Sequence, residues 1–190
     1  MTAVNPDQRT TDSALPAPSA DWEARIARVW AAMDDVPPEE FRARVRELTA
    51  ELPDGHPVAA FELASAHDST GQGDVAAPLY RQALAAGLSG YRRRRTSVQL
   101  GSTLRNLGAL EDSLAMLGAE RAIDPALLDE PTRELADSVD AFYALALADA
   151  GREREALSLA LGALARHLPR YNRSLANYAK ALDDPATRDA

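Results

Sequence analysis

The chain has 190 residues, 46% of them hydrophobic, which is enough for one domain or a short repeat array with a continuous core. It has no cysteine, so disulfides, thiol nucleophiles and cysteine metal sites are excluded. Its net charge of -8 argues against nonspecific binding to nucleic acid, whose phosphates need a basic face. No apolar stretch approaches the about 20 residues that span a bilayer, and the N-terminal residues lack the apolar core of a signal peptide. We therefore expect a cytoplasmic protein that binds neither nucleic acid nor a membrane.

The N-terminal part of the sequence predicts a polar tail followed by a helical hairpin. Residues 1–20 are rich in Thr, Ser, Pro and Asp, and we expect them to be disordered. Residues 21–53 form the predicted hairpin, in which Asp21 caps the first helix and Pro37-Pro38 separates the two helices. Each helix has one apolar face, made of Trp22, Ile26, Val29, Trp30 and Met33 in the first and of Phe41, Val45, Leu48 and Leu52 in the second.

Residues 57–169 divide into three similar units, each of which predicts two helices joined at a glycine. The units span residues 57–88, 94–125 and 137–168, and they turn at Gly71, Gly108 and Gly151. Between the second and third units, Pro131 is expected to open a lengthened helix. A last helix, predicted at residues 170–184, has an apolar face of Tyr171, Leu175, Tyr178 and Leu182. No segment shows the alternation of a strand, so the sequence predicts an all-α fold.

The spacing within the units resembles the tetratricopeptide repeat. Counted from the start of each unit, position 7 is large, positions 8 and 20 are small and position 15 is glycine. In the three units these positions hold Leu63, Leu100 and Tyr143 at 7, Ala64, Gly101 and Ala144 at 8, and Ala76, Ser113 and Ala156 at 20. Small residues let the two helices of a unit approach closely, and glycine adopts the left-handed conformation that ends the first helix. The segments FELASAHDSTG at 61–71, LRNLG at 104–108 and GREREA at 151–156 also resemble short actinobacterial tetratricopeptide repeat proteins of group 5.

This resemblance implies an architecture and a class of function. The implied fold is a right-handed α-solenoid of three units, with the N-terminal hairpin at one end and a C-terminal capping helix at the other. The implied function is that of a bacterial, non-enzymatic adaptor or regulatory scaffold that holds a peptide or protein segment in its concave groove, without a cofactor or a metal.

The first helix of each unit lines the concave face in this family, which identifies candidate partner-binding residues. The middle unit contributes two arginines and an asparagine, and an arginine fork beside an amide suits a partner carboxylate. The candidates are Phe61, Ser65, Asp68, Arg95, Ser102, Arg105, Asn106 and Asp149.

Some candidate residues also have purely structural interpretations. Asp68 and Arg105 occupy the same position in neighbouring units, and they could simply pair with each other. Glu120 stands where the repeat prefers a small residue, so we expect one arginine of the Arg92–Arg95 run to neutralise it. His67 beside Asp68 is the one faint candidate for acid–base chemistry, and a packed, hydrogen-bonded histidine is the competing interpretation.

Trp22 and Trp30 leave the oligomeric state open between a monomer and a homodimer. In one interpretation they pack the hairpin onto the first unit as a cap, because a short repeat array exposes apolar ends. In the other, the Trp22/Trp30 helix mediates self-association, and the chain is a structural subunit.

Overall fold

The computed structural model describes residues 15–183, and this part of the chain is helical without a strand. Nine helices of 12 residues or more run through it, together with one short α-helix and two 3-10 turns. The all-α prediction is confirmed. Residues 1–14 of the expected disordered tail lie outside the described residues.

The N-terminal hairpin consists of α1 (Ala20–Ala31), the 3-10 turn η1 (Met33–Asp35) and α2 (Pro38–Thr49). Ser19, and not Asp21, caps α1, because its hydroxyl accepts a hydrogen bond from the backbone N–H of Trp22 at 3.2 Å. Asp21 instead lies in the first turn, where a carboxylate favours the positive end of the helix dipole. The helix therefore starts earlier than the sequence predicted, inside the expected tail.

The three repeat units are three antiparallel helical hairpins. They pair α3 (Pro57–Ser69) with α4 (Gly73–Ala85), α5 (Gly90–Asn106) with α6 (Leu110–Arg121), and α8 (Ala136–Asp149) with α9 (Glu153–Ala165). Each hairpin also contacts the next, α4 against α5 and α6 against α8, and α2 contacts α3. α5 begins four residues before the predicted start of the second unit, so all four arginines of the run lie inside it.

Glycine determines both the turns and one close crossing. Gly71, Gly108 and Gly151 have φ values of +80°, +80° and +73°, which confirms their predicted left-handed conformation. At Gly101 an added Cβ would lie 2.5 Å from Cγ of Leu117, so α5 and α6 cross too closely there for any side chain. Ser113 closes the same crossing, because its hydroxyl donates to the Gly101 carbonyl oxygen at 2.7 Å.

The connection between the second and third units differs from the prediction. Pro131 lies in a separate one-turn helix, α7 (Glu130–Arg133), after the 3-10 turn η2 (Pro125–Leu127). The chain leaves helical pairing at Glu134 and Leu135 before α8 starts, so the lengthened helix expected from Pro131 does not form. Asp129 caps α7 by accepting from the Thr132 N–H at 3.0 Å.

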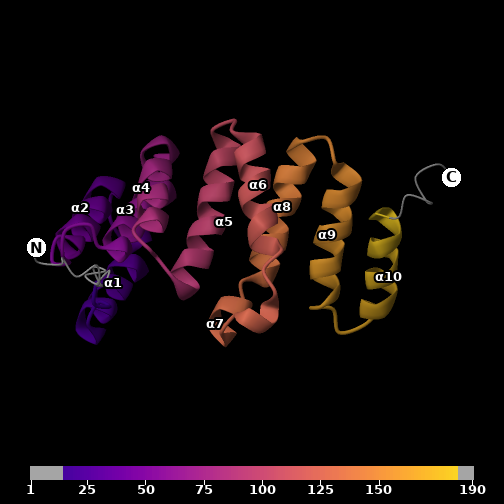
Figure 1. Ribbon diagram of the computed structural model, residues 1–190, viewed down its shortest axis with the longest axis horizontal. Coiled ribbons are helices and arrows are strands. Elements are labelled where there is room, and N and C mark those ends of the chain that lie inside the picture. Colours follow the sequence, from indigo (N-terminus) through magenta and orange to yellow (C-terminus); the bar gives the residue numbers. More distant parts are fainter. Residues whose placement is uncertain (1–14, 184–190) are drawn as a thin grey trace, which may run out of the picture.

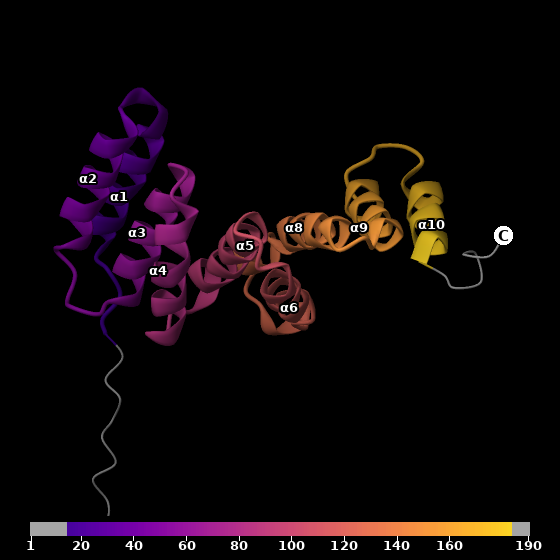
Figure 2. The same ribbon diagram turned by 90° about the horizontal axis from the view of Figure 1, so that it is seen from above.

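From α4 onward the long helices follow one another along the molecule in sequence order, and the ends of the described chain lie far apart (Figure 1). The main core extends from Trp22 to Leu104 and joins the N-terminal hairpin to the first two units. A smaller cluster is centred on Ala144, Leu147 and Ala156. In both views α8, α9 and α10 (Asn172–Asp183) lie side by side in a single row (Figures 1 and 2).

The terminal helix α10 packs on α9 with only part of the predicted face, since Leu175 and Leu182 are half-buried and the tyrosines are not. Its buried residue is Ala179, whereas Tyr171 and Tyr178 are 78% and 71% exposed. Tyr171 also precedes the helix, with a φ of 65°. The periodicity correctly predicted a helix, but its packed face is centred on Ala179, with Leu175 and Leu182 on either side, and excludes the two tyrosines.

Candidate binding surface

One face of α5 carries most of the candidate partner-binding residues. Arg95, Ser102 and Arg105 follow one another at intervals of seven and three residues, so they share a helical face with Asn106. Asn106 is exposed and the other three side chains are half-buried. The structure thus places these four together on an accessible face of the second unit.

At the C-terminal end of this face, Arg105 joins the second unit to the third. One terminal guanidinium nitrogen donates to Oδ2 of Asp149 on α8 at 2.8 Å, and the other donates to Oδ1 of Asn106 at 3.2 Å. The Nε of Arg105 is buried and has no hydrogen-bond acceptor within residues 15–183. Arg105, Asn106 and Asp149 therefore form a single polar cluster, which the sequence predicted only as separate residues.

Asp68 belongs to a different cluster. Its carboxylate accepts from the Thr103 hydroxyl at 2.9 Å and from the Tyr80 hydroxyl at 3.2 Å, and burial raises the pKa of this carboxyl above its ordinary value. Because Asp68 bonds to Thr103 and Tyr80 while Arg105 bonds to Asp149, the expected Asp68–Arg105 pair is wrong.

Phe61 and Ser65 lie beneath the surface instead of on it. Both residues are 0% exposed. The Phe61 ring supports two guanidinium groups, with Cζ of Arg95 at 5.2 Å and Cζ of Arg92 at 5.9 Å from its centroid. Ser65 accepts a long hydrogen bond of 3.5 Å from the Tyr80 hydroxyl. The prediction that these two side chains are open to a partner is corrected, since the first helix of unit one is covered where that of unit two is not.

The arginine run at the start of α5 is mostly neutralised by acids from other helices. Arg93 and Arg94 both form ion pairs with the buried carboxylate of Glu120, the latter at 3.0 Å, so the predicted neutralisation of Glu120 is confirmed. Arg92 donates to both carboxylate oxygens of Glu23, at 2.9 and 2.6 Å. Arg95 forms no ion pair within the described chain and instead stacks on aromatic rings.

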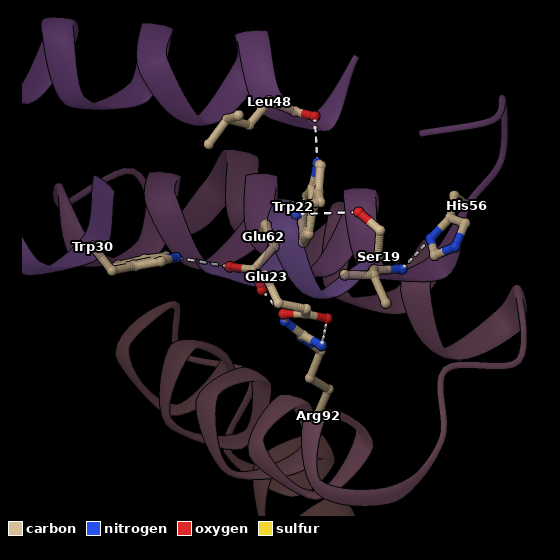
Figure 3. Close-up of polar contacts among 9 residues, drawn as sticks. Ser19, Trp22, Glu23, Trp30, Leu48, His56, Glu62 and Arg92 are labelled. Carbon is tan, nitrogen blue, oxygen red and sulfur yellow. Dashed lines mark hydrogen bonds and ion pairs between the residues drawn. The ribbon is translucent and has the colours of Figure 1, made fainter. Parts of the chain in front are cut away.

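Glu62 is a polar residue of this region that the sequence analysis missed. Its buried carboxylate on α3 accepts from Trp30 Nε1 at 2.7 Å and from Arg92 Nε at 3.1 Å (Figure 3). Burial is the main influence on this carboxyl and raises its pKa, although Arg92 opposes the shift. A glutamate within the apolar sequence PVAAFELASA was the available signal, because a buried carboxylate needs a donor. Glu62 ties α1, α3 and α5 together.

The tryptophans pack the N-terminal hairpin onto the first unit. Trp22 is 2% exposed, and its indole N–H donates to the Leu48 carbonyl oxygen at 2.8 Å. Trp30 packs edge-on against Phe41 with ring centroids 5.0 Å apart, while its N–H is bonded to Glu62. Trp22 is buried and Trp30 is half-buried against other residues of the same chain, which favours the interpretation of the hairpin as a cap. Self-association through the Trp22/Trp30 helix stays a prediction.

His67 and Asp68 do not act on each other. The His67 Nδ1 lies 2.6 Å from Oε1 of Gln72, whereas Asp68 bonds to Thr103 and Tyr80. The histidine is half-buried and hydrogen-bonded in the turn that ends α3. The geometry matches the packed interpretation and supplies no acid–base pair at these two residues.

Among the described helices, none combines the length and the apolar character that a bilayer crossing requires. In the comparison with known protein families, residues 57–182 match the family model described as tetratrico peptide repeat. No curated protein and no solved structure matched the chain. The matched residues cover the three hairpins and nearly all of α10, and they make up more than half of the chain. With the stacked hairpins and the close Gly101 crossing, this match shows that the chain belongs to the tetratricopeptide repeat family.

Proposed function

We propose that the chain is an adaptor or regulatory scaffold that holds a protein or peptide segment along the exposed face of α5. The repeat family suggests a protein–protein interaction module and is generally non-catalytic. A scaffold of stacked hairpins holds such a face rigid, which lowers the entropic cost of binding.

The polar cluster of Arg105, Asn106 and Asp149 is the observation that carries this proposal. It lies at the junction of two units, and its guanidinium combines two anchoring bonds with a buried Nε that has no acceptor in the described chain. Asp149 is about half exposed, so a partner carboxylate can displace it from Arg105. The partner would then exchange one ion pair for another, and α5 and α8 would keep their relative position.

Peptide selection followed by affinity measurement tests the proposal. Peptides are selected from a random library on the wild-type chain, and each is titrated against wild type and a double variant with Arg105→Ala and Asn106→Ala. Loss of two charge-assisted or amide bonds should weaken binding by about 10–100-fold. Arg44→Ala is the matched control, since Arg44 pairs with Glu40 on the surface of α2, in the N-terminal hairpin. Peptides that bind both variants as tightly as wild type would reject this surface.

A further inference from the structure

A cleft lies at the N-terminal end of α5, away from the Arg105 cluster. Its volume is about 850 Å³, within the usual range for small-ligand sites. Three segments form its walls: the chain before α1 together with Glu23 of α1, residues 55–58 at the start of α3, and the α4–α5 connection together with the first turns of α5. The apolar part of the lining includes Leu15, Pro18, Val58 and Leu88.

The wall formed by the segment before α1 is held in place by His56. This histidine is buried, and its Nδ1 accepts from the Val58 backbone N–H at 3.1 Å. Because a backbone N–H only donates, the neutral ring carries its proton on Nε2, which donates to the Pro16 carbonyl oxygen at 3.0 Å. One side chain thus caps α3 and fixes the adjoining wall (His56 is labelled in Figure 3).

Of the two arginines that line the cleft, Arg95 is the one that forms no ion pair within residues 15–183. Glu23 and Arg92 both line it, but they are bonded to each other through two contacts. Arg95 also lines the cleft, and no carboxylate oxygen of residues 15–183 lies within ion-pair distance of its guanidinium, although its charge helps to lower the pKa of Glu62. Two aromatic rings contact this guanidinium, with Cζ 5.2 Å from the Phe61 centroid and 5.9 Å from that of Tyr91.

Stacking of this kind fixes a guanidinium while leaving its N–H edge for an acceptor. An arginine edge matches the two oxygens of a carboxylate, and aromatic support limits the rotamers that binding would otherwise have to freeze. The remaining lining offers apolar contact close to that edge. The site therefore combines one available cation with an apolar floor.

We propose that this cleft binds a carboxylate that carries an apolar group beside it, with Arg95 as the residue that holds the carboxylate. The same chemistry is found at the C-terminus of a peptide with apolar last residues and in a free acid with an apolar chain. The inference rests on the proposed function only in the first case, where the cleft receives the end of the bound segment.

Titration with three probes, followed by NMR of the full chain, tests this site. The probes are N-acetyl-leucyl-leucine, its C-terminal amide and octanoate. Both carboxylates should shift the resonances of Tyr91, Ser89 and Leu88, and the amide should bind at least about tenfold more weakly. Tighter binding of the peptide acid identifies a chain terminus as the ligand, and equal or tighter binding of octanoate identifies a free amphiphilic acid.

Two variants separate charge from shape. Arg95→Gln removes the cation and should reduce the affinity for both acids by about 10–100-fold, with the fold intact because Arg95 makes no ion pair in the described chain. Ala86→Trp places a large ring in the cleft from an exposed lining position and should block binding without changing any charge. Arg44→Gln should have no effect.

The proposal is overturned if neither acid shifts these resonances, if the amide binds as well as the acid, or if Arg95→Gln binds both acids as wild type does. The double variant at Arg105 and Asn106 separates this failure from failure of the proposed function. If the Arg105 variant loses affinity for the selected peptides while Arg95→Gln keeps its affinity for the acids, the proposed function is supported and the proposed ligand site in the cleft is rejected.

Discussion

Glu62 shows how one residue can connect three helices. It accepts from Trp30 on α1 and from Arg92 on α5, and it is itself part of α3. Two donors compensate much of the cost of burying its carboxylate, but burial still dominates and raises its pKa. A buried carboxylate of this kind makes the free energy of unfolding depend on pH.

We predict that Glu62→Gln changes the pH dependence of stability. In the unfolded chain this carboxyl ionises near 4.5, whereas the folded chain keeps the proton to a higher pH. Between these two pKa values the native state binds more protons, so the free energy of unfolding of wild type falls as pH rises. Each unit of separation corresponds to about 1.4 kcal/mol. Urea unfolding across the range from about pH 4 to pH 8 should give a flatter profile for Glu62→Gln than for wild type.

Substitution of Glu51 by glutamine is the control for this experiment, because the pKa of Glu51 is shifted in the opposite direction to that of Glu62. A hydrogen bond from Arg25 is the largest influence on this exposed carboxyl and lowers its pKa below 4.5. Its contribution to stability is therefore present at neutral pH and is lost as the pH falls below 4.5. Parallel profiles for wild type and Glu62→Gln would contradict the assigned role of Glu62.

At the scale of elements, the sequence predicted helices better than it predicted their ends. Asp21 looked like the cap of α1, but Ser19 holds that position, since both residue types are good caps and only the backbone path selects between them. Repeat spacing predicted that the second unit starts at Arg94, but α5 starts at Gly90. The additional turn is stabilised by ion pairs of Arg92, Arg93 and Arg94 with carboxylates of neighbouring helices. Such partners lie far away in the sequence, so no local pattern reveals them.

The crossing of α5 and α6 gives a direct test of packing within a unit. Gly101→Ala should reduce the free energy of unfolding by about 1–3 kcal/mol, because the new Cβ would lie 2.5 Å from Cγ of Leu117. Gly162→Ala in α9 is the matched control, since nothing lies within 4 Å of its added Cβ. That substitution should stabilise the chain by about 0.5–1 kcal/mol through lower backbone entropy in the unfolded state. Chemical denaturation measures both, and equal effects would refute the close crossing.

For the whole molecule, the core becomes thinner toward the C-terminus. The main cluster ends near Leu104, and the row of α8, α9 and α10 leaves Leu157 and Leu164 each 48% exposed. The only buried residues of α9 are Ala156 and Ala165, and the only one of α10 is Ala179. Small side chains contribute little free energy on burial, so the C-terminal helices have the weakest hydrophobic stabilisation of the described chain.

We predict that α9 and α10 open before the rest of the chain. Native-state hydrogen exchange should give amides in these helices protection factors at least about tenfold lower than those in α3 and α4, which carry the buried rings of Phe61 and Tyr80. Uniform protection from α3 to α10 would mean that the solenoid unfolds as one unit, contrary to this gradient.

The sequence supported the architecture well and the binding surface only in part. Small residues at Gly101 and Ser113 and glycines at the turns are local requirements of the hairpin, so spacing alone was enough to predict them. The burial of Phe61 depends instead on the arginines that α5 places over its ring, and the contact between Arg95 and this ring appears only after the units stack. The cleft could not be predicted, because one of its walls is the segment before α1, which lies outside the repeats.

The participation of that N-terminal wall has a practical consequence for dissecting the protein. A fragment trimmed to residues 57–182, the region that the family match delimits, would lack His56, Trp30 and Glu23. The trimmed fragment would leave Glu62 with one donor, Arg92 without its two-contact partner and the cleft open on one side. Shortening the chain to its repeats would thus remove the contacts that position Glu62 and Arg92 and one wall of the cleft.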